Sequence, residues 1–245
     1  KMGIDVIALP KSHVPPYLEK FKSDQYVSAG SLFEPDFEKI YELKPDLIII
    51  SPRQAKSYEE FIKIAPTLYV ETDSNDYINS FKKNIMTLGK IFEKEDFVNK
   101  EFKALEESIN SINKKVTEAG KRAVVIMVND GALSVFGKGS RFDSIYKEFG
   151  FGQADENIEV SNHGQSISFE YIAEKDPEYI FVVDRGAVVG GNVSAKQVLE
   201  NDIVKEASAY KNGNIIYLDS FAWYVSTGGF GSTAIMVEDV MKATE

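Results

Sequence analysis

Two arginines, Arg53 and Arg185, occupy equivalent places in the two halves of this 245-residue chain. They lie 132 residues apart, and each follows an apolar run that predicts a buried β-strand. The guanidinium group is planar, and its fork of N–H donors suits carboxylate, phosphate or catecholate oxygens. Arg141, on a glycine-flanked loop, could join them. Each arginine could instead pair with a local acid, but the matched positions of Arg53 and Arg185 favour an anion site.

His163 and Tyr224 are candidate metal ligands. His163 lies in the polar loop 161–166, and Tyr224 follows Trp223 in an aromatic stretch between the last expected strand and a glycine-rich turn. Imidazole and phenolate both ligate ferric iron, although two protein ligands cannot fill an octahedral site. Ordinary loop hydrogen bonds and ring stacking remain the alternative interpretation of both residues.

Composition argues against several functional classes. The chain has no cysteine, which excludes disulfides, thiolate metal sites and cysteine catalysis. A net charge of −10 argues against a nucleic-acid partner. The glycine-rich stretch 185–191 does not match a phosphate-binding loop, and no Ser/His/acid triad appears at recognisable spacing. The sequence therefore gives no positive case for an enzyme.

The elements that must position these residues occur twice. Residues 37–53 align with residues 169–185 at the constant offset of 132, and seven of the seventeen positions are identical. Strand and helix alternate, which implies parallel sheets whose ligands lie beyond the carboxyl ends of the strands. We expect strands at 4–9, 46–50, 67–70, 123–129, 179–183 and 214–218, and helices at 35–43, 58–64, 75–92, 140–149, 169–175, 195–199 and 232–243.

One long helix is predicted between the repeats. Glu95–Glu118 carries a single apolar stripe, with Gly120 after its end, and should form a rod of about 35 Å. We therefore expect an α/β fold of two Rossmann-like lobes with parallel sheets and a ligand cleft between them. The lobes are residues 1–94 and 120–245, and the bridging helix is 95–119. Compared with the second lobe, the first lobe lacks its opening strand and helix, so we expect a truncated or processed N-terminus.

These patterns resemble the helix-backboned substrate-binding proteins of ABC importers for siderophores, haem and cobalamin (class III). Within that family, the chain is similar to the catecholate-siderophore subgroup, which includes petrobactin and enterobactin-type binders. The motifs that carry this similarity are Phe136-Gly-Lys-Gly-Ser-Arg141-Phe142, Asn162-His163-Gly164-Gln165-Ser166, Val183-Asp184-Arg185, and Tyr217-Leu218-Asp219 followed by Trp223-Tyr224.

The resemblance implies a role for each candidate residue. Arg53, Arg141 and Arg185 would face a ferric catecholate, whose tris-catecholate form carries three negative charges. His163 and Tyr224 would complete the coordination of iron when the siderophore supplies only two catecholates. Two further roles follow from the same resemblance. Trp223 and Tyr224 would make aromatic contact with the ligand, and Glu38 and Glu170 would dock onto the permease.

The resemblance also implies a location and partners. We expect an extracytoplasmic monomer, in a periplasm or lipid-anchored as a lipoprotein outside the cytoplasmic membrane, that delivers its ligand to an ABC importer permease dimer. It would have no intrinsic cofactor, because iron enters as part of the siderophore. The same scaffold could instead bind haem, cobalamin or a hydroxamate siderophore. A chelatase- or reductase-like enzyme of paired lobes is the alternative from another class, but it would require cluster-binding cysteines.

Overall fold

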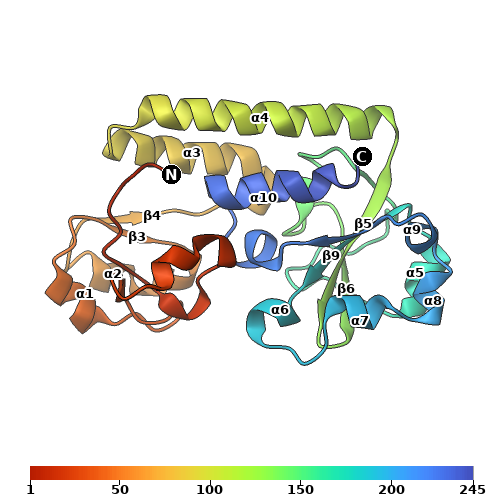
Figure 1. The fold of residues 1–245 in the computed structure, drawn as a ribbon, viewed down its shortest axis with the longest axis horizontal. Coiled ribbons are helices and arrows are strands. Elements are labelled where there is room, and N and C mark those ends of the chain that lie inside the picture. Colours follow the sequence, from red (N-terminus) through yellow and green to blue (C-terminus); the bar gives the residue numbers. More distant parts are fainter. Residues whose placement is uncertain (245) are drawn as a thin grey trace. The chain divides into compact units, whose positions relative to one another are not determined.

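The computed structural model describes residues 1–244, and their contacts divide the chain into two compact units. The first unit holds residues 1–72 and 83–98, and the second holds residues 73–82 and those from 99 onward. Helices α3 (Tyr77–Ile91) and α4 (Glu95–Glu118) each have residues in both units (Figure 1). The lobe boundaries expected at the ends of the long helix stay a prediction. Among the described helices, none combines the length and apolarity that a membrane span requires.

The first unit contains two pairs of short parallel strands. The pairs are β1 with β2 and β3 with β4, and Ile40, Ile50 and Phe61 form a small core beside them. Its first strand is shorter than the expected 4–9. The elements are β1 (Ala8–Leu9), β2 (Val27–Ser28), α1 (Phe37–Leu43), β3 (Ile48–Ile50), α2 (Tyr58–Phe61) and β4 (Thr67–Tyr69).

The second unit is built on a six-stranded mixed sheet. Its strands lie in the order β10, β9, β5, β6 and β8, and β7 pairs with β5. The strands are β5 (Arg122–Asn129), β6 (Ala132–Phe136), β7 (Gly152–Gln153), β8 (Gln165–Ile167), β9 (Tyr179–Asp184) and β10 (Ile215–Leu218). The helices after α4 are α5 (Phe169–Lys175), α6 (Gly186–Val189), α7 (Ala195–Leu199), α8 (Asp202–Lys205), α9 (Ser208–Lys211) and α10 (Phe230–Met241).

The expectation of purely parallel sheets is wrong for one part of this sheet. Strand β6 runs antiparallel to both β5 and β8. Asp130 and Gly131 join β5 to β6, and both have positive φ, 50° and 92°. An Asp-Gly pair favours this two-residue hairpin turn, so local turn chemistry reverses the chain where a crossover helix was expected. The α/β fold class with mainly parallel strands is confirmed.

Alternate residues of β5 enter the two cores of the second unit. Val125 and Met127 pack in one core with residues of α4 and α10, while Val124 and Ile126 pack in the other. The second core also contains residues of α5, α7 and α8, so helices cover both faces of the sheet (Figure 1). A strand covered on both faces is apolar throughout, which explains its continuous hydrophobic run.

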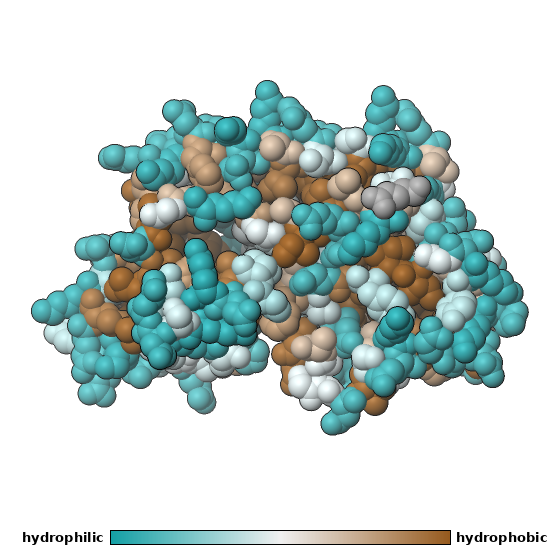
Figure 2. Space-filling model, in the orientation of Figure 1, coloured by the Kyte–Doolittle hydropathy of each residue, from teal (hydrophilic) through white to brown (hydrophobic). Residues whose placement is uncertain are grey.

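Helix α4 has the bounds that its periodicity predicted. Its apolar stripe is formed by six residues, of which Leu105 is partly buried and the other five are buried: Val98, Phe102, Ile109, Ile112 and Val116. Its other positions carry Glu, Lys and Asn, and Figure 2 shows hydrophilic side chains along the upper edge of the view, over α4. The apolar stripe therefore packs inward along this helix.

The helix expected at 140–149 does not form. Only Asp143–Ile145 form a short 3₁₀ turn, and the five residues 142–146 are all buried. A regular helix at a protein surface needs a polar exposed face, whereas Lys147 is the only exposed residue of 140–149. The Asp143 carboxylate also accepts the N–H of Gly139 at 2.7 Å, which favours the turn. Tertiary contacts override the local helical preference here.

Candidate functional site

Three neighbouring parallel strands of the second unit end at one edge of the sheet. Strand β9 lies between β5 and β10 and runs parallel to both. Asn129 ends β5, and Arg185 directly follows β9. Tyr224 lies in a single turn of π-helix, Phe221–Val225, that follows β10. Residues far apart in the sequence therefore meet beyond the carboxyl ends of the strands, where ligands of α/β sheets bind.

Tyr224 lies between two of the predicted arginines. Arg185 donates from Nε to the Tyr224 hydroxyl at 2.9 Å and from Nη1 to Asn129 Oδ1 at 2.8 Å. The Arg141 guanidinium carbon lies 4.2 Å from the centroid of the Tyr224 ring, within cation–π distance. Arg141 also donates to the backbone carbonyl of Tyr224 at 3.3 Å. The structure thus brings two of the three proposed arginines together with one of the two proposed metal ligands.

The two arginines change the acidity of the Tyr224 phenol. Partial burial opposes ionisation, but the hydrogen bond from Arg185 and the charges of Arg185 and Arg141 outweigh it. The pKa of Tyr224 is therefore lower than the ordinary value of 10.0. A lower pKa makes the phenolate, the form that binds a hard cation, easier to reach.

Arg185 has only uncharged partners among the described residues, namely Tyr224 and Asn129. Neighbouring Asp184 does not pair with it, because its two carboxylate oxygens accept the N–H groups of Ala187 at 3.1 Å and Ala195 at 2.7 Å. The alternative in which Arg185 is neutralised by a local acid therefore does not apply. Its charge is available to an anionic ligand.

Trp223 is buried in the core and does not lie where a ligand contact was predicted. Its side chain is 2 % exposed and packs against Phe149 in the core of the second unit. Its indole N–H donates to the buried carboxylate of Asp239 at 3.1 Å. The expectation that Trp223 touches the ligand is corrected, because its ring is enclosed by the protein. It anchors the π-helical turn from which Tyr224 reaches the arginines.

His163 is exposed on a turn of the second unit. Its backbone N–H donates to Ser161 Oγ at 3.3 Å. The turn is held close to the sheet, because a Cβ on Gly164 would lie 2.7 Å from the Phe136 ring. Within residues 1–244, no hydrogen bond joins His163 to Tyr224, and no three His, Cys, Asp or Glu side chains are grouped to hold a metal ion.

The remaining predicted residues are exposed on separate elements. Arg53 lies in the 3₁₀ segment Pro52–Ser57 directly after β3, in the first unit. Glu38 and Glu170 lie in the first turns of α1 and α5. A hydrogen bond from Ser168 lowers the pKa of the Glu170 carboxyl, which keeps it charged. No contact of these three residues identifies a ligand or partner.

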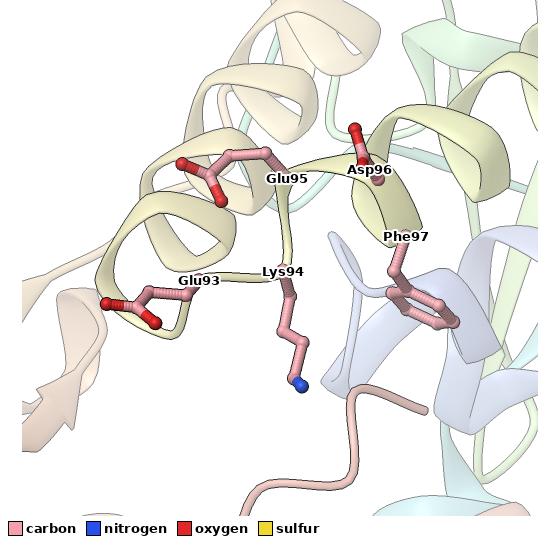
Figure 3. Close-up of a pocket in the computed structure, with 5 residues that line it drawn as sticks. All are labelled: Glu93, Lys94, Glu95, Asp96 and Phe97. Atoms are coloured by element: carbon pink, nitrogen blue, oxygen red, sulfur yellow. The ribbon is translucent and has the colours of Figure 1, made fainter.

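A surface hollow lies at residues 93–97, and none of the predicted site residues lines it. It is formed by the turn between α3 and α4 in the first unit. Figure 3 shows that Lys94 points away from Glu95 and Asp96, so the side chains that line the hollow do not converge on a common point. Acidic side chains in the first turn of a helix are explained by the helix dipole. We assign no ligand site there.

Asn129 is the site residue that sequence reasoning missed. The available signal was the Asn-Asp-Gly run after a buried strand, because an Asp-Gly hairpin leaves the preceding residue at the strand end. With β5 next to β9, that residue lies beside Arg185.

Comparisons with known proteins agree on one family. A family model described as periplasmic binding protein matches residues 5–222. The petrobactin-binding protein YclQ of Bacillus subtilis is 51 % identical over 247 residues, covering 100 % of this chain and 78 % of the relative. The ferric-anguibactin-binding protein FatB of Vibrio anguillarum is 32 % identical, covering 99 % of this chain and 77 % of the relative.

Solved structures of related proteins have the same fold. The crystal structure of YclQ superposes with a TM-score of 0.94 and 50 % identity, covering 100 % of this chain and 86 % of that one. The catecholate-siderophore binding protein VctP of Vibrio cholerae gives a TM-score of 0.90 and 43 % identity, covering 98 % of this chain and 87 % of that one.

Proposed function

Because this chain belongs to the periplasmic binding protein family, we propose that it captures a ferric catecholate siderophore outside the cytoplasmic membrane and delivers it to an ABC importer. The relatives that match it are named as binding proteins, for petrobactin, ferric anguibactin and catecholate siderophores. Those names support a transport function rather than an enzymatic one.

One observation carries the proposal: the Tyr224 hydroxyl accepts a hydrogen bond from Arg185 while Arg141 lies over its ring. The two guanidinium groups offer positive charge to a polyanion, and a ferric tris-catecholate carries three negative charges. Their charges also lower the pKa of a phenol that can ligate ferric iron. A neutral hydroxamate complex or cobalamin would leave this charge without a counterpart.

We assign the site residues as follows. Arg141 and Arg185 contact the catecholate oxygens, and Arg53 of the first unit is a further cationic contact. Tyr224 and His163 ligate iron when the siderophore supplies only two catecholates. The exposed position of His163 on its turn allows such a contact. Iron is the cargo in this scheme, and the protein needs no resident cofactor.

The same proposal covers location and partners. The protein works as a monomer outside the cytoplasmic membrane, either free or anchored as a lipoprotein. Exposed Glu38 and Glu170 dock onto the permease dimer of the importer, one from each unit. Both glutamates lie in the first turn of equivalent helices, α1 and α5. Each unit therefore offers one similarly placed carboxylate to the permease dimer.

The experiment is a titration with ferric bis-catecholate and ferric tris-catecholate, followed by Trp223 fluorescence and by the catecholate-to-iron absorption band. Tyr224→Phe and His163→Ala should weaken the tetradentate bis-catecholate far more than the hexadentate tris-catecholate. Tyr217→Phe, an exposed tyrosine of β10, is the matched control and should change neither affinity.

Two results would contradict parts of this proposal. Equal losses for both complexes would remove the ligation roles of Tyr224 and His163. Binding of haem or cobalamin without binding of any ferric catecholate would overturn the proposed ligand while leaving the family unchanged.

A further inference from the structure

Asn129 and Arg185 are held beside each other by the backbone. In the β5–β9 ladder Val128 pairs with Asp184, and the backbone N–H of Arg185 donates to the carbonyl of Val128 at 2.9 Å. The hairpin turn after Asn129 fixes the end of β5. The two side chains therefore emerge from adjacent strand ends whose relative position is set by main-chain hydrogen bonds.

The Arg185 guanidinium donates hydrogen bonds from two of its nitrogen atoms. Tyr224 accepts from Nε, and Asn129 Oδ1 accepts from Nη1. Two bonds at different nitrogens of a rigid planar group fix both its position and the direction of its plane. Because a guanidinium has five N–H donors, these two hydrogen bonds leave donors on Nη1 and Nη2 for a ligand.

The carboxylates next to Asn129 and Arg185 in the sequence, those of Asp130 and Asp184, accept hydrogen bonds from other groups. Asp130 accepts the backbone N–H of Asn192 at 3.0 Å and its side-chain amide at 3.3 Å. Asp184 accepts two backbone N–H groups of the segment that follows Arg185. Besides the Tyr224 hydroxyl, Arg185 is thus bound by the neutral amide of Asn129, while Asp130 and Asp184 accept from other donors.

We propose that Asn129 is a positioning residue that holds Arg185 toward Tyr224 without neutralising it, and that this neutral hold makes the site selective for multiply charged anions. The selectivity rests on the proposed function, whereas the hold itself does not. A carboxylate at position 129 would keep the geometry but pair with the guanidinium, as charge-assisted pairs do. It would then compete with the charge of an incoming anion.

The positioning of Arg185 by Asn129 is tested without any ligand. The chain has four arginines, so a ¹⁵N-resolved spectrum of their Nε–H groups is simple, and Arg185→Lys assigns the signal of Arg185. We expect a sharp signal in the wild type, a broadened or shifted one in Asn129→Leu, and a sharp one in Asn129→Asp. An unchanged Arg185 signal in Asn129→Leu would overturn the positioning role.

The charge argument is tested with ferric tris-catecholate. Asn129→Leu should bind about tenfold more weakly, the effect of losing one hydrogen bond to a charged group. Asn129→Asp should bind at least about tenfold more weakly although the hold persists, and added salt should reduce the difference. Asn214→Ala, at the opposite end of β10, is the control and should bind like the wild type.

Wild-type affinity in Asn129→Asp would overturn the proposed selectivity. Failure of the wild type to bind any ferric catecholate would overturn both the proposed function and this selectivity. The ligand-free spectrum would still decide whether Asn129 positions Arg185, so the two failures can be told apart.

Discussion

The buried carboxylate of Asp239 should be a main support of the segment that carries Tyr224. Asp239 is 4 % exposed on α10. Its Oδ2 accepts the backbone N–H of Asp219 at 2.8 Å and the indole N–H of Trp223 at 3.1 Å. Its Oδ1 pairs with Lys242 at 2.7 Å. Asp239→Leu removes all three interactions.

The expected loss follows from these contacts. Two N–H donors lose their acceptor, at about 1–3 kcal/mol each. The pair with Lys242, whose side chain is 58 % exposed, adds at most about 1 kcal/mol. Removing a buried charge offsets part of this cost. We expect Asp239→Leu to lower the free energy of unfolding by about 2–4 kcal/mol, since the two orphaned donors outweigh that offset.

Urea unfolding monitored by fluorescence measures this loss directly, because Trp223 is the only tryptophan of the chain. Asp239→Asn, which keeps an oxygen acceptor for both donors, should lose about 1 kcal/mol. Lys242→Met should lose less than about 1 kcal/mol. If Asp239→Leu is no less stable than Lys242→Met, the argument that Asp239 anchors this segment is wrong.

Three further changes test other parts of the second unit. Tyr77→Phe removes a buried hydroxyl bonded to Thr233 at 2.7 Å and should cost about 1–3 kcal/mol in urea unfolding. Burial raises the pKa of the Glu148 carboxyl, so its contribution to stability is present at low pH and lost as pH rises through the raised value. Glu148→Gln should therefore unfold at a higher temperature than the wild type at neutral pH, and the difference should vanish below the ordinary carboxyl pKa of 4.5; a constant difference would contradict this. Gly164→Ala forces a Cβ against Phe136 at φ +76°, and should lower the melting temperature and shift the imidazole signals of His163, whereas unchanged signals would refute the close contact.

Much of the fold could be predicted from local patterns. The period of the apolar residues set the bounds of α4, and the repeat at an offset of 132 predicted equivalent elements that the structure contains. Lys44 and Asp176, which are 132 residues apart, both adopt left-handed backbone at the ends of α1 and α5. The antiparallel β6 was missed because a two-residue turn, not periodicity, decides strand direction there.

The candidate site was only partly predictable. Arg185 and Tyr224 were identified by residue type and by their places beyond strand ends, and Arg141 by its glycine-flanked loop. The second unit brings the three together. Asn129 was missed because its only signal was the Asp-Gly turn that follows it, and that turn was not recognised as the end of β5. Trp223 was misassigned because the sequence cannot tell which of two adjacent aromatic residues faces the core.

The sequence by itself determined the class of the elements, the repeat and the residue types able to bind an anion, because these depend on local periodicity and side-chain chemistry. Only the tertiary structure decided that Tyr224 meets Arg185 while Trp223 meets Asp239. Those contacts join residues that are distant in the chain or differ only in the direction of a side chain. Their pairing is set by strand order and by the π-helical turn, which no local pattern specifies.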